Sequence, residues 1–93
     1  MNIDHIIIED QIRDREKMIK EHNDALIAGM IVSAGILQVE LDTFKEKFET
    51  FCNALDTKDP EKVKRAYIEA FHAFDPANSR VITISSLIQR LKL

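Results

Sequence analysis

Apolar residues recur at helical spacing along most of the chain, and the longest such stripe begins at Leu26. Its successive members lie three or four residues apart, which places them on one face of a helix. The pattern resembles the heptad repeat of a coiled coil, with one irregular step at Leu37. It predicts a long central helix over residues 25–56, about 45 Å long at about 1.5 Å per residue. The members of the stripe are Leu26, Met30, Ser33, Leu37, Leu41, Phe44, Phe48, Phe51 and Leu55.

A weaker stripe precedes this one and predicts an amphipathic helix over residues 3–22. Its apolar members are Ile8, Ile12 and Ile19, and charged residues occupy most of the other positions. The polar run EHND follows at residues 21–24. Either Asn23 or Asp24 caps a new helix there, or one helix runs through. The pattern leaves both interpretations open.

The clearest boundary in the chain is the run DTKDPEK at residues 56–62. Asp59 suits the N-cap of a helix, and Pro60 suits its first position. We predict a helix over residues 60–75, ending before Pro76 because the residue before a proline disfavours the α region. The short connection implies an antiparallel hairpin. In such a hairpin Phe51 lies near Tyr67, and either Phe44 or Phe48 lies near Phe71 and Phe74.

The C-terminal segment has a mixed pattern. Val81, Ile84, Ile88 and Leu91 are spaced as on a helix, whereas the β-branched run at residues 81–84 also permits a strand. We interpret residues 80–92 as a final helix. The predicted fold is therefore all-α: a single domain over residues 1–93, forming a helical hairpin or small helical bundle with one long central helix.

The segment from Ala25 to Val39 carries no charged residue, although 31% of the chain is charged. A helix that is apolar on every side needs lipid, its own fold or another subunit around it. Fifteen residues are fewer than the roughly 20 that a membrane span requires. Glycine inside a helix costs about 1 kcal/mol, so Gly29 and Gly35 suggest close contact with another helix. We therefore expect a homodimer with this segment at its centre, and no membrane span.

Size and composition narrow the class of protein further. The 93 residues form one small domain with a net charge of −3, which is atypical of nucleic-acid-binding proteins. The lone cysteine, Cys52, excludes an intrachain disulfide and favours a reducing, cytoplasmic setting. The N-terminal residues lack the basic region of a secretory signal peptide.

No pattern of catalytic residues is present. Glu69 and His72 have the Glu-x-x-His spacing of di-metal bundles, but helical geometry turns them away from the apolar face of their helix. Cys52 has no histidine placed to activate it, and the glycines form no phosphate-binding loop. We predict no enzyme activity, no cofactor and no metal site.

The expected function is that of a non-catalytic protein-binding module: a small adaptor, chaperone, inhibitor or assembly factor acting through apolar helix faces. One alternative is a small membrane-associated helical protein that uses residues 25–39. Another is a nucleic-acid-binding dimer with a basic rim, for which Lys58, Lys62, Lys64, Arg65, Arg80, Arg90 and Lys92 would have to lie together. We expect a protein partner and no nucleic acid. The predicted partner or dimer interface consists of Ile8, Ile12, Ile19, Leu26, Gly29, Met30, Ser33 and Leu37.

Overall fold

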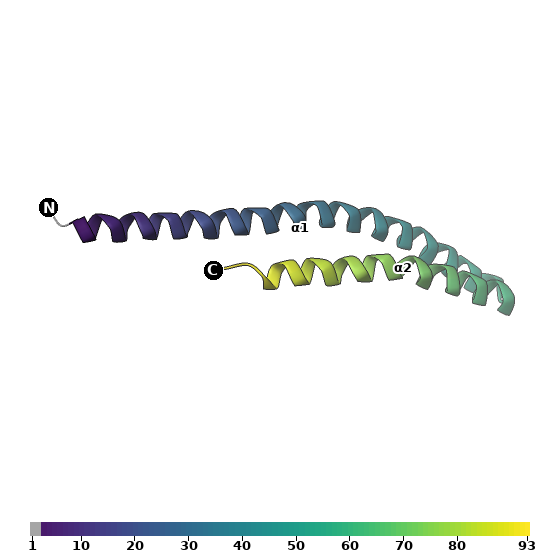
Figure 1. Ribbon diagram of the computed structural model, residues 1–93. Coiled ribbons are helices and arrows are strands. Elements are labelled where there is room, and N and C mark those ends of the chain that lie inside the picture. Colours follow the sequence, from purple (N-terminus) through teal and green to yellow (C-terminus); the bar gives the residue numbers. More distant parts are fainter. Residues whose placement is uncertain (1–2) are drawn as a thin grey trace.

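Two long helices make up the computed structural model, which describes residues 3–93 and the side chains from Glu9 onwards. Helix α1 spans Ile3–Thr57 and helix α2 spans Pro60–Gln89. They run antiparallel as a slender hairpin measuring 85 × 16 × 13 Å (Figure 1). The predicted all-α helical hairpin is confirmed. Because α2 is the shorter helix, the N-terminal part of α1 extends beyond it as a single helix.

The turn forms as its sequence predicts. Asp59 has extended backbone angles, and its carboxylate accepts a hydrogen bond of 3.0 Å from the backbone N–H of Glu61. Pro60 occupies the first position of α2, where its missing N–H costs nothing. Lys58 has a φ of +56°, the left-handed conformation in which helices commonly terminate. These local signals reverse the chain within two residues.

Helix α1 continues through the EHND run, so one continuous helix replaces the predicted segments 3–22 and 25–56. The polar residues of the run hold the C-terminal end of the chain. Asn23 donates a hydrogen bond of 2.7 Å to the carbonyl of Lys92 and accepts one of 2.9 Å from its N–H. The Nε2–H of His22 donates to the carbonyl of Arg90 over 3.0 Å. Together these hydrogen bonds connect the residues that follow α2 to α1.

We predict that Asn23→Ala loosens this attachment. The substitution removes two exposed hydrogen bonds that together contribute roughly 1 kcal/mol, so local opening becomes about fivefold more frequent. Hydrogen–deuterium exchange should accelerate by that factor at residues 87–92 and stay unchanged near the turn. Asn78→Ala is the control, because Asn78 is exposed on α2. Equal exchange in the two variants would contradict the prediction.

Helix α2 does not end at Asp75; it runs through Pro76 to Gln89, and residues 80–84 are helical. The predictions of a helix end before Pro76 and of a separate helix from residue 80 are therefore wrong. Proline in a helix interior costs about 3 kcal/mol, mainly through a lost hydrogen bond and a clash with the preceding turn. Packing against α1 on both sides of Pro76 offsets this cost. Both helices curve together in the half of the hairpin nearest the turn (Figure 1).

The seam between the helices is thin and built from small residues. The buried side chains of α2 are Ala66, Ala70 and Ala77, and Ala70 has an exposed fraction of zero. On α1, from Glu9 onwards, only Leu26 and Ser33 are buried. Among the described residues, no large side chain is fully buried. The hairpin thus covers one side of each helix and leaves most of their apolar surface outside the seam.

Candidate binding surfaces

The central segment, residues 25–39, has α2 along one side only. Leu26 and Ser33 are buried in the seam, while Met30 and Leu37 are half-buried beside them. A Cβ atom added to Gly29 would lie 3.5 Å from Leu87 Cδ1, so Gly29 also borders α2. Five of the eight predicted interface residues therefore border the chain's own second helix: Leu26, Gly29, Met30, Ser33 and Leu37.

The remaining sides of the central segment are uncovered. Ile31, Val32 and Val39 have exposed fractions of 68%, 63% and 65%. Gly35 is exposed, and a Cβ atom added there would have no neighbour within 4 Å. This outward side of α1 is apolar and largely uncovered by the hairpin, although Val39 borders a shallow depression that Ala73 and Pro76 of α2 also line.

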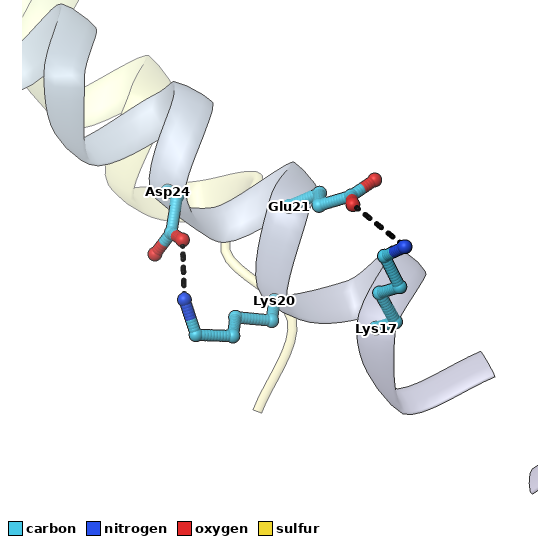
Figure 2. Close-up of polar contacts among 4 residues, drawn as sticks. All are labelled: Lys17, Lys20, Glu21 and Asp24. Atoms are coloured by element: carbon cyan, nitrogen blue, oxygen red, sulfur yellow. Dashed lines mark hydrogen bonds and ion pairs between the residues drawn. The ribbon is translucent and has the colours of Figure 1, made fainter. Parts of the chain in front are cut away.

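The N-terminal arm, residues 9–21 of α1, is a solvated single helix. Ile12 is exposed and Ile19 is half-buried, whereas the Ile8 side chain lies outside the described residues. Ion pairs link neighbouring turns: Lys17 with Glu21 at 4.0 Å and Lys20 with Asp24 at 2.8 Å (Figure 2). The hydrogen bond to Asp24 and its negative charge raise the pKa of Lys20. Each exposed pair of this spacing adds only about 0.3–0.5 kcal/mol, so the arm is weakly stabilised.

A broad apolar face lies beside the seam and involves both helices. On each helix its members are spaced at multiples of seven residues, which keeps them on one side of a helix. Their exposed fractions lie between 40% and 53%. We define the apolar face as Ile27, Leu41, Phe48 and Leu55 of α1 with Tyr67, Phe74, Val81 and Ile88 of α2.

Aromatic rings connect the two helices along this face. The centroids of Phe44 and Phe74 lie 5.3 Å apart, and those of Phe51 and Tyr67 lie 5.9 Å apart. The predicted pairing of Phe51 with Tyr67, and of Phe44 with Phe74, is thus confirmed. Phe44 and Phe51 are half-buried between the helices, whereas the other rings of the cluster are 40–48% exposed. Phe71 contacts Tyr67 at 4.4 Å and is itself 42% exposed.

Near the turn, the opposite face of the hairpin is polar. Thr50, Thr57, Arg65 and Glu69 line a shallow depression there, together with Lys62. We call this part of the surface the polar face. Farther from the turn, a second depression is lined mainly by apolar residues: Val39, Ala73 and Pro76, with Glu40 and Thr43.

An ion pair also crosses the seam. Arg80 Nε donates to Glu40 Oε1 over 3.0 Å, and the side-chain exposed fractions are 33% for Arg80 and 15% for Glu40. The basic residues do not form one rim. Arg65 and Arg90 lie near opposite ends of α2, about 37 Å apart at about 1.5 Å per residue. A nucleic-acid-binding dimer with a basic rim would need these positive charges to lie together, and the hairpin spreads them along α2.

The residues considered for catalysis or metal binding do not form a cluster on the described surface. Glu69, His72 and Cys52 are all exposed. The described residues include no group of three or more His, Cys, Asp or Glu side chains placed to hold a metal ion.

Within the described residues, one helix is long and apolar enough to cross a membrane by length and composition. It spans Glu9–Thr57, and only 11% of its most apolar 18-residue window is buried in the hairpin. The residues 25–39 lie inside this helix. The same feature also occurs in core helices of soluble proteins, so it leaves a membrane and a protein partner as competing neighbours.

Comparison with known proteins finds no matching family model, no similar curated protein and no similar solved structure. The class that the fold defines is that of a two-helix, all-α hairpin with exposed large apolar side chains on both helices.

Proposed function

We propose that this chain is a non-catalytic protein-binding module, of the adaptor, chaperone, inhibitor or assembly-factor kind, that acts through its apolar helix faces in a cytoplasmic setting. One observation carries the proposal. The chain exposes 7551 Å2. A compact monomer of its 10.7 kDa mass exposes about 5,500 Å2. The hairpin thus leaves about 2,000 Å2 more surface uncovered than a self-sufficient fold.

The character of the uncovered surface supports binding to protein. Large apolar side chains such as Ile31, Val32 and Val39 are more than 60% exposed. Contiguous apolar surface of this kind marks interaction sites in soluble proteins. Helices that lay an apolar side against another helix are a common means of partner recognition. A homodimer is one form of this binding, and a different protein partner is another.

The competing function is association with a membrane through residues 25–39. The length and composition of α1 favour it. Several features oppose it: Asp24 and Glu40 flank the segment closely, and Glu40 is paired with Arg80 in the hairpin. A charged side chain within a bilayer costs several kcal/mol. Insertion of α1 would also require this part of the hairpin to separate.

Site-specific photo-crosslinking in the native host tests the proposal. A photoreactive amino acid replaces Val32, which is 63% exposed on the outward side of α1. Glu46 is the matched control, because it lies two heptads farther along the same side and is also exposed. We expect a discrete protein adduct at Val32 and none at Glu46.

Lipid adducts at Val32, together with partition of the chain into detergent, would support association with a membrane and contradict the protein-binding function. Failure of both positions to form any protein adduct would exclude a protein partner on this outward side of α1.

A further inference from the structure

We infer that the apolar face is the surface on which a second copy of this chain packs, so that two hairpins form a four-helix bundle. The inference rests on the proposed binding function and assigns it a surface and a partner. That surface is distinct from the outward side of residues 25–39.

The exposed fractions of the apolar face match one half of a bundle. A core residue of a four-helix bundle is covered partly by its own hairpin and partly by the opposite one. Leu41, Phe48, Phe74 and Val81 are 43%, 43%, 40% and 48% exposed. Each is therefore about half covered within one chain. The heptad spacing supplies the regular positions that bundle packing uses.

The area of the face matches what a stable dimer needs. On α1 the face runs from Ile27 to Leu55, about 42 Å at about 1.5 Å per residue, and on α2 it runs from Tyr67 to Ile88, about 32 Å. Each helix is about 10 Å across, so each copy offers about 740 Å2. This area is close to the roughly 800 Å2 per partner of a standard interface.

The composition of the face favours a second copy over a different partner. A two-fold symmetric interface must be complementary to itself. The apolar face contains no charged residue, so two copies meet without like-charge repulsion. The polar face, with Lys62, Arg65 and Glu69, would bring like charges together in many of the same symmetric arrangements.

A matched pair of substitutions tests the inference in the full-length chain. Val81→Lys places a charge on the apolar face, and Val39→Lys places the same charge on the outward side of α1. Both valines are exposed, by 48% and 65%, so neither change disturbs the seam of the hairpin. Sedimentation velocity at tens of micromolar measures association, and circular dichroism checks helicity.

We expect the wild type and Val39→Lys to be dimers and Val81→Lys to be a monomer, with a dissociation constant raised at least about 100-fold. The reason is that a dimer of Val81→Lys would bury an unpaired lysine from each copy in the bundle core. If Val81→Lys loses helicity, Leu41→Lys serves as a second variant, with the charge on the α1 part of the apolar face. We expect it to be a monomer as well.

Two outcomes would overturn the inference in different ways. A monomeric Val39→Lys beside a dimeric Val81→Lys would move self-association to residues 25–39 and leave the proposed binding function intact. A monomeric, fully helical wild type would exclude the second copy altogether. In that case the Val32 crosslinks decide separately whether the chain binds another protein.

Discussion

Replacing Ala70 by leucine should destabilise the hairpin by about 1–3 kcal/mol, the cost of overpacking a close-packed site. Ala70 has an exposed fraction of zero in the seam between α1 and α2. Leucine adds three carbon atoms with no space to hold them. Leucine and alanine have similar helix propensities, so the loss reflects contact between the helices.

Urea denaturation followed by circular dichroism measures this effect, at one fixed protein concentration because self-association shifts apparent stability. Ala28→Leu is the control, since Ala28 lies exposed on α1. Its free energy of unfolding should change by no more than about 0.5 kcal/mol. Equal midpoints for the two variants would show that the alanine seam does not hold the helices together.

Replacing Arg80 by methionine should lower the free energy of unfolding by roughly 1–3 kcal/mol. Arg80 is the partner of Glu40, whose side chain is only 15% exposed. Removal of one member of a largely buried pair leaves the other charge desolvated and unpaired, and this usually costs more than the pair itself contributes. The expected value is below that of a fully buried pair because Arg80 is one-third exposed.

The double variant Glu40→Met with Arg80→Met provides the decisive comparison. It removes the orphaned carboxylate and should recover most of the lost stability, whereas two independent effects would add. Arg13→Met is the control, because Arg13 pairs with Asp10 at 2.7 Å on the exposed arm. Its effect should not exceed about 1 kcal/mol. A double variant less stable than Arg80→Met would contradict this account of the pair.

Together these substitutions separate the seam from the binding surfaces. Changes at Ala70 and Arg80 act on folding, whereas changes at Val81 and Val39 act on association. A protein whose buried seam consists mostly of small side chains leaves many of its large apolar side chains exposed for a partner. The small internal core of the hairpin is therefore consistent with the proposed four-helix bundle, in which a second copy covers the exposed apolar side chains.

Part of the proposed binding surface was visible in the sequence and part was not. The apolar face follows a heptad spacing, at residues 27, 41, 48 and 55 and again at 67, 74, 81 and 88. The long stripe predicted from the sequence begins with Leu26, Ser33 and Leu37, which the structure places against α2. The same stripe continues through Leu41, Phe48 and Leu55, which the structure leaves on the apolar face. Spacing alone shows that a stripe is apolar. It does not show whether the chain itself or a partner covers that stripe.

The sequence by itself determined the helical class and the position of the turn, because spacing, the Asp59 cap and Pro60 act through neighbouring residues. Only the tertiary structure decided that α1 is unbroken at Asn23 and that α2 continues through Pro76. It also decided that Ala66, Ala70 and Ala77 face the seam. Most of the aromatic rings remain 40–48% exposed beside it. The rotation of a helix about its axis depends on how closely its neighbour approaches, and small residues allow the closest approach.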